Sequence, residues 1–118
     1  VSLALNSKIP ITLVPESINV PAGVSYRCWH YPALGLAFVR IYLPARSTRV
    51  YRKGTEYTLY TIPDGPGYPA FSSALYVHGG VENNINSRVN DGKISITPRL
   101  ADVQADNLIT IGGFWFTE

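Results

Sequence analysis

The pattern of hydrophobic and polar positions is that of short strands separated by turns. Segments rich in Val, Ile, Tyr, Thr and Phe are interrupted at short intervals by Pro, Gly and Asn, which is typical of all-β domains. Helical periodicity is nearly absent, and its best candidate, 99–107, indicates a loop or a single turn. We expect strands at 10–15, 24–31, 34–44, 55–62, 72–79, 85–89, 93–97 and 107–117. About eight strands at this spacing predict an antiparallel β-sandwich or a jelly-roll-like barrel.

Local sequence gives some of these strands a place in the fold. The strand at 10–15 is bounded by prolines, which favours the edge of a sheet. The strand at 34–44 is apolar at nearly every position, so we expect both of its faces to be covered. The sequence Asn-Asp-Gly at 90–92 accepts the positive φ angles of a tight turn and predicts a hairpin.

The segment 61–70, TIPDGPGYPA, raises the question of whether the chain has one domain or two. Its three prolines fix φ and restrict the residues before them, so we expect a stiff corner and not a flexible linker. Composition does not change across it. We therefore predict one domain over residues 1–118, and the absence of methionine suggests that it is part of a longer or processed chain.

The last strand is apolar on both faces. Alternation places on one face Leu108, Thr110, Gly112, Phe114 and Phe116, and on the other Ile109, Ile111, Gly113 and Trp115. A sandwich strand normally keeps one face in solvent. We expect burial of the second face against another subunit, in a homotrimer with Trp115 and Phe116 near the threefold axis. The alternative is a strand covered by loops of its own chain.

Composition narrows the classes of partner. A net charge of +2 is too small to indicate nucleic-acid binding. The sequence contains no apolar run of about 18 residues, so it predicts no membrane-spanning helix. The single cysteine, Cys28, excludes an internal disulfide, and its apolar surroundings indicate a buried thiol.

Motifs of catalysis and of metal or cofactor binding are absent from the sequence. It contains no G-x-S-x-G, H-E-x-x-H or P-loop pattern. Asp102 and Asp106 lack a third acidic residue at the spacing of a calcium site. We therefore expect a protein that is not an enzyme and needs neither a metal nor a cofactor.

Saccharide binding fits the remaining chemistry, because sugars stack on aromatic rings beside planar polar groups. Trp29, His30 and Tyr31 follow one another at the end of a strand, and alternation puts Trp29 and Tyr31 on the face opposite to Cys28. A core position for Trp29 is the alternative. Asp64 and Tyr68 on the stiff corner form a second candidate site, with a structural role for Tyr68 as its alternative.

The order of the later segments resembles the C-terminal head domains of phage tail receptor-binding proteins from phages of Gram-positive hosts. The resemblance covers about 54–117 and rests on YTLYTIP, GYP, DGKISITP and NLITIGGFWF. The chain departs from the family at DGPGYPA, which lacks the usual arginine before the proline. The resemblance implies a homotrimeric head on the tail tip or baseplate of the virion that contacts other tail proteins and adsorbs to host-surface saccharide.

Two other classes remain open. A bacterial fimbrial adhesin or pilin is also all-β, but its domain lacks a strand that a neighbour supplies, whereas the terminal strand here is strong. A carbohydrate-binding module of a hydrolase is a monomer joined to a catalytic domain. The mass in solution separates the three classes.

Overall fold

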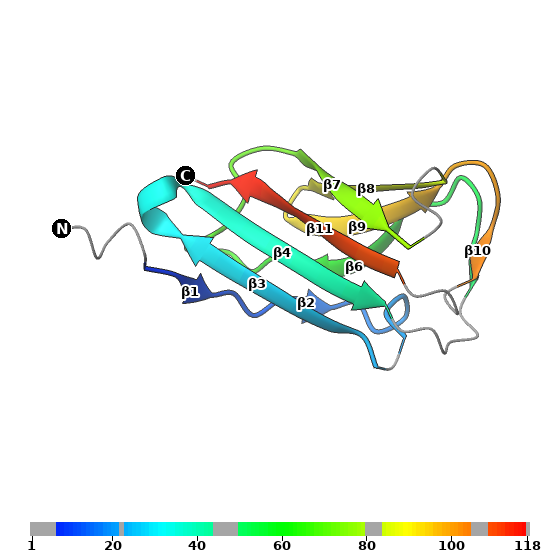
Figure 1. Cartoon of the computed structure of the whole chain (residues 1–118), viewed down its shortest axis with the longest axis horizontal. Coiled ribbons are helices and arrows are strands. Elements are labelled where there is room, and N and C mark those ends of the chain that lie inside the picture. Colours follow the sequence, from blue (N-terminus) through cyan, green and yellow to red (C-terminus); the bar gives the residue numbers. More distant parts are fainter. Residues whose placement is uncertain (1–6, 22, 44–49, 80–83, 105–108, 118) are drawn as a thin grey trace.

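The computed structural model describes residues 7–21, 23–43, 50–79, 84–104 and 109–117. Over these residues the chain is almost entirely β, as Figure 1 shows, so the prediction of an all-β fold is confirmed. The one helical element in this part of the chain is a single 3-10 turn, η1 (Pro32–Leu34), which ends at Gly35 with a φ of 65°. Proline opens this turn and glycine closes it, so it serves as a tight connection between two strands.

The described residues form seven strands of five or more residues, which lie in the segments where strands were predicted. Four further strands have two residues each. The long strands are β3 (Ser25–Tyr31), β4 (Leu36–Leu43), β6 (Tyr57–Thr61), β7 (Ser73–His78), β8 (Ile85–Asn90), β9 (Lys93–Pro98) and β11 (Ile109–Phe116). The short ones are β1 (Ile9–Pro10), β2 (Val14–Pro15), β5 (Val50–Tyr51) and β10 (Val103–Gln104). The pairing of β10 with β5 corrects the expectation of a loop or single turn at 99–107.

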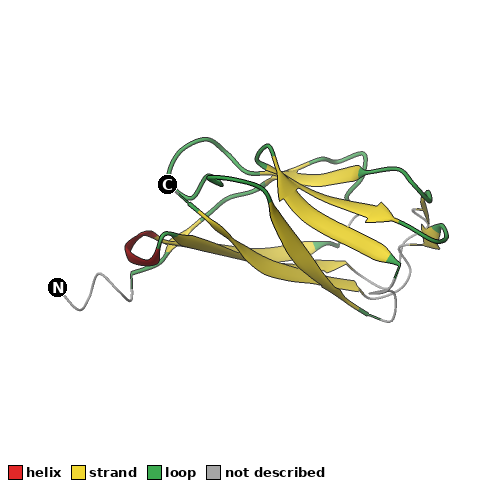
Figure 2. Cartoon of the chain, turned by 90° about the horizontal axis from the view of Figure 1, so that it is seen from above, coloured by secondary structure: helices red, strands yellow, loops and turns green. Residues whose placement is uncertain are grey.

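Nine of the strands form one antiparallel sheet in the order β1-β3-β4-β11-β7-β8-β9-β6-β2. The sheet curls into a half-barrel with two layers, and in Figure 1 β3, β4 and β11 lie in front of β6 and β9. The strand β7 belongs to both layers, because Ser73–Leu75 pairs with β8 whereas Tyr76–His78 pairs with β11. Figure 2 shows the two layers from above, enclosing the core between them.

The two edges of the curled sheet are connected by residues 9–15. β1 pairs with β3, and β2 pairs with β6 on the other layer, so the predicted strand at 10–15 is an edge strand divided in two. Between them the Tyr26 hydroxyl donates to Leu13 O at 3.3 Å and accepts from Leu13 N at 2.9 Å. This side chain satisfies backbone groups that no strand pairs, which a buried crossing requires.

The core fills the space between the layers and takes one face of each long strand. β4 contributes Ala37, Val39, Ile41 and Leu43, and β11 contributes Ile109, Ile111 and Trp115. The opposite face of β4 is open, since Phe38 and Arg40 are exposed. The expectation that both faces of 34–44 are covered is therefore wrong for this chain, because nothing described lies over the outer side of the sheet.

The segment 61–70 is attached to both layers. Ile62 N donates to Gly92 O at 2.7 Å in the β8–β9 turn, and Trp115 Nε1 donates to Gly67 O at 2.8 Å. The corner is therefore held at both ends, where Ile62 and Gly67 are buried, whereas residues 63–66 between them are exposed. The hairpin turn at 90–92 is as predicted, with positive φ angles of 53° at Asp91 and 69° at Gly92.

Candidate functional site

Four neighbouring strands present a continuous outward surface, which we call the outer face: the outward side chains of β3, β4, β11 and β7. Strand register aligns these side chains in lines across the sheet. The central line consists of Arg27, Arg40, Gly112 and Tyr76. The line on one side of it consists of Ser25, Tyr42, Thr110 and His78. The line on the other side consists of Trp29, Phe38 and Phe114.

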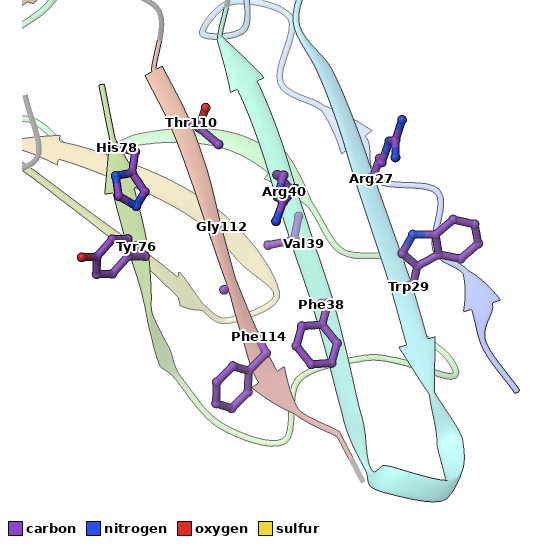
Figure 3. Close-up of a pocket in the computed structure, with 11 residues that line it drawn as sticks. Arg27, Trp29, Phe38, Val39, Arg40, Tyr76, His78, Thr110, Gly112 and Phe114 are labelled. Atoms are coloured by element: carbon purple, nitrogen blue, oxygen red, sulfur yellow. The ribbon is translucent and has the colours of Figure 1, made fainter. Parts of the chain in front are cut away.

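The centre of the outer face is hollowed at Gly112. This residue has no side chain and is flanked in register by Arg40 and Tyr76, so the larger side chains around it enclose a space of about 440 Å³ (Figure 3). A Cβ at Gly112 would have Val39 O at 3.5 Å as its nearest neighbour, which is an ordinary contact. The backbone therefore does not require glycine here, and what glycine provides at this position is the open space.

The charge on the outer face is positive and unbalanced. Arg27 and Arg40 lie directly opposite each other on neighbouring strands. The four strands contain no Asp or Glu, and neither arginine forms an ion pair with any residue that the structure describes. Lys8 adds a third cation, with its Nζ 4.4 Å from the centre of the Trp29 ring. The face thus carries three cations and no described counter-charge.

A row of aromatic rings crosses one end of the outer face. The ring centroids are 5.5 Å apart for Tyr31 and Phe38, 5.9 Å for Phe38 and Phe114, 5.7 Å for Phe114 and Phe116, and 5.6 Å for Phe116 and Phe71. We call these five residues the aromatic row. Its four phenylalanines are between 41% and 60% exposed, although ring contacts of this kind normally accompany burial. An exposed apolar patch of this kind marks an interaction surface.

Of the predicted site residues, the structure places Trp29 and Tyr31 on the outer face. Trp29 is half-buried and borders the hollow, and Tyr31 begins the aromatic row, so neither is a core side chain. His30 points the other way and is only 6% exposed. Its Nε2 lies 3.3 Å from Thr117 Oγ1, and its Nδ1 has no partner within the described residues. The grouping of His30 with Trp29 and Tyr31 is corrected, because strand alternation separates it from both.

The other two candidates, Asp64 and Tyr68, lie apart from Trp29. Asp64 is exposed on the corner, whereas Tyr68 is half-buried and packs on the hairpin turn, where a Cβ at Gly92 would be 2.6 Å from its hydroxyl oxygen. Between them, Gly67 is buried on the His30 side of β3. The structure therefore gives Tyr68 a packing role and does not combine these residues into one site with Trp29.

The position of Trp115 differs from the expected place near a threefold axis. It is fully buried within its own chain, where its indole nitrogen donates to Gly67 O. A position for this side chain at a threefold axis is excluded by that burial, and the expectation is corrected. Phe116, named with it, is on the outward side of the same strand and is exposed. The division of the strand into two faces was predicted correctly, but the face available to a partner is the one with Phe114 and Phe116.

The sequence pointed to the outer face through Trp29, Tyr31 and the side of the last strand with Phe114 and Phe116. It missed the outward residues of β4 and β7, which are Phe38, Arg40, Tyr76 and His78. These residues alternate with core residues on β4 and β7, so period-2 alternation was the signal that could have found them. The run of apolar residues at 34–44 hid that signal, because an exposed phenylalanine cannot be told from a core phenylalanine when its neighbours are also apolar.

Ionisable groups elsewhere have structural explanations. Burial raises the pKa of the Cys28 thiol to about 12, in agreement with a buried, unreactive cysteine. Asp102 accepts from Lys53 N at 2.7 Å and from Arg52 Nη1 at 3.1 Å, which lowers its pKa. Asp106 lies outside the described residues. Within the described part of the chain no three His, Cys, Asp or Glu residues gather as metal ligands would.

The chain matches no protein-family model, and no curated protein or solved structure is significantly similar to it. In the described part of the chain, no helix has the length and hydrophobicity needed to span a membrane. The function therefore has to be inferred from the surface of the domain itself.

Proposed function

We propose that this domain binds saccharide through the hollow on its outer face, as a non-enzymatic receptor-binding head of a phage tail or baseplate protein. The observation that carries the proposal is the hollow at Gly112, an open space bordered by aromatic rings and by planar or hydroxyl donors. A volume of about 440 Å³ lies in the range of small-ligand sites, roughly 300–1,000 Å³.

The chemistry around the hollow matches what a sugar ring needs. Tyr76, at 66% exposure, and Phe114 offer ring faces for the C–H side of a sugar. Arg40, His78 and Thr110 offer donors and acceptors for its hydroxyl groups. Because strand pairing fixes the backbone beneath these side chains, no loop has to be ordered on binding, which favours affinity.

Binding without turnover fits the position of the acids. A glycoside hydrolase needs two carboxyl groups, about 5–9.5 Å apart, around the bond that it cleaves. The described carboxylates lie away from the hollow, which no Asp or Glu borders. We therefore propose that the saccharide is held and not cleaved.

The proposed assembly is a homotrimer on the virion, in contact with other tail or baseplate proteins. The end of the aromatic row that does not border the hollow, Phe71 and Phe116, supplies an apolar surface for a subunit contact, in place of Trp115. A trimer would present three hollows to a repetitive cell surface, and linked weak sites gain avidity. The strand β11 is paired with β4 along its whole length, so the domain needs no donated strand there, unlike a pilin.

Binding to an array of bacterial surface polysaccharides tests the site. Gly112→Leu should fill the hollow and Tyr76→Ala should remove a stacking face, and each should weaken binding about tenfold or more. Leu100→Ala is the matched control, because Leu100 is 64% exposed but does not border the hollow. Equal binding by all three variants, or no binding by the wild type, would contradict the proposal.

The mass in solution tests the assembly. Light scattering at tens of micromolar should give a trimer, and Phe116→Ser should shift it toward the monomer by replacing an exposed ring of the aromatic row with a hydroxyl. A wild-type monomer at that concentration would remove the homotrimer from the proposal while leaving saccharide binding to the array experiment.

A further inference from the structure

The arginine pair on the central line has an energetic cost that nothing described offsets. Cβ atoms directly opposite on neighbouring strands are about 4.5–5.5 Å apart, and like charges at such positions destabilise the sheet. Arg27 and Arg40 are such a pair. The side chain of Arg27 forms no hydrogen bond with another described residue, and the side chain of Arg40 donates only to the Tyr42 hydroxyl, at 3.4 Å.

Two arginines elsewhere in the domain show the contrast. Arg52 lies 3.1 Å from Asp102, and Arg88 lies 2.7 Å from Glu56. Those side chains are as exposed as surface residues usually are, yet each has a carboxylate. Arg99 has no carboxylate partner among the described residues either, so what sets the outer-face pair apart is that two unpaired cations lie directly opposite each other.

We infer that the saccharide bound in the hollow is anionic, with a phosphate or carboxylate group held between Arg27 and Arg40. The inference rests on the proposed function and adds the ligand class. Two guanidinium groups give several N–H donors for the oxygens of one such group, and charge-assisted bonds of this kind are short and strong. Lys8 adds positive charge at the Trp29 end of the same surface.

The register also sets how the ligand lies. Strands are about 4.8 Å apart, so the central line from Arg27 to Tyr76 spans about 14 Å. An acidic group over the arginines would place the attached sugar above Gly112 and against Tyr76, where the hollow is. The open position at Gly112 thus lies where the ring would be, beside the charge and not under it.

A nucleic acid is a poorer fit to the same surface. Proteins that bind nucleic acids present many cations along an extended track, and the whole chain has a net charge of only +2. Three cations beside a hollow of this size match one or two acidic groups. Single-stranded oligonucleotides are therefore a competing outcome in the test.

The test uses matched pairs of polysaccharides in binding measurements with the wild-type chain. A phosphate-bearing bacterial polysaccharide is compared with its dephosphorylated form, and a uronic-acid polysaccharide with its carboxyl-reduced form. One acidic form should bind about tenfold or more tighter than its neutral partner, and that preference should shrink as salt is raised. The pair that responds identifies which acidic group is recognised.

Arginine variants locate the effect. Arg40→Gln and Arg27→Gln should each remove most of the preference for the acidic form, because each should weaken binding of the acidic form more than binding of the neutral form. Arg99→Gln is the matched control, because it makes the same change of charge at an exposed arginine away from the outer face. Arg40→Gln should also leave the melting temperature unchanged or higher, since it relieves repulsion, whereas a structural arginine would lower it.

The outcomes separate the two proposals. Equal binding of acidic and neutral forms, or an equal loss in Arg99→Gln, overturns the inference and leaves saccharide binding in place. Absence of binding to every polysaccharide overturns the proposed function as well. Tighter binding of a single-stranded oligonucleotide than of any polysaccharide overturns both.

Discussion

The two layers of the domain share one core but differ in what they present to solvent. On the opposite face, formed by the outward side of β6, β8 and β9, Glu56 accepts from Arg88 Nε at 2.7 Å and Arg88 Nη2 at 3.1 Å. It also accepts from Ser95 Oγ at 2.7 Å. On the outer face, the arginines have no carboxylate, and aromatic rings are exposed. The arginine of the opposite face therefore has a carboxylate partner within the chain, whereas neither arginine of the outer face has one among the described residues.

This difference indicates where a partner belongs. A surface whose charges and hydrogen bonds are already paired gains little from a ligand, because any new contact replaces an old one. A surface with unpaired cations and exposed rings gains from both kinds of contact. The outer face is therefore the side on which binding and association should be sought.

The largest expected effect separates inner from outer aromatic residues on one strand. Trp115→Ala should lower the free energy of unfolding by about 3–5 kcal/mol, because it leaves a cavity in the core. Phe114→Ala should cost about 1 kcal/mol or less, since that ring is 45% exposed and loses only ring contacts. Urea unfolding at low protein concentration measures both without a contribution from association.

The milder variant Trp115→Phe keeps most of the apolar volume and removes the donor to Gly67 O, so it should cost about 1–3 kcal/mol. This variant replaces Trp115→Ala in the comparison if the alanine variant does not fold. If Phe114→Ala cost as much as Trp115→Ala, the outer ring would be part of the folding core and not a surface kept for a partner.

A second comparison uses the adjacent glycines of β11. Gly113 has a φ of 152°, and a Cβ there would be 2.9 Å from Leu75 Cδ2, so Gly113→Ala should cost about 1–3 kcal/mol. Gly112→Ala has neither problem and should leave stability unchanged or raise it by up to about 1 kcal/mol. Thermal unfolding of the two variants gives the difference. Equal losses would mean that Gly112 is required by the backbone, and the hollow would then be incidental.

Much of the fold could be predicted from the sequence because strand patterns are local. Alternation in 24–31 correctly separated Trp29 from Cys28, and Asn-Asp-Gly correctly predicted the hairpin at 90–92. The sheet order could not be predicted, because it depends on pairings between distant segments. Alternation could have placed Phe38 on the outer side of its strand, but its exposure also depends on whether anything covers that side of the sheet, which no local pattern states.

Part of the candidate site was within reach of the sequence. The turn between β3 and β4 joins Tyr31 and Leu36, and counting back four residues from the first and forward four from the second pairs Arg27 with Arg40. That count needs the strand ends, which Pro32 and Gly35 mark. Gly112 and Tyr76 could be added to the same line only by knowing that β11 pairs with β4 and β7. No local sequence pattern gives those pairings.

The smallest expected effect tests the paired side of the comparison through pH. Hydrogen bonds from Arg88 and Ser95 lower the pKa of Glu56 to about 2 from an ordinary value of 4.5. A lowered pKa stabilises the folded state above the ordinary value, and this contribution is lost as the pH falls toward 2. Because the pair is exposed and screened by solvent, it should be worth only about 1 kcal/mol or less.

Glu56→Gln should therefore be less stable than the wild type by that amount at pH 6, and the difference should vanish near pH 2. Added salt should also reduce the difference at pH 6. A difference that stayed constant down to pH 2 would show that Glu56 contributes through packing and not through its charge, and the opposite face would then not be the charge-paired surface of the comparison.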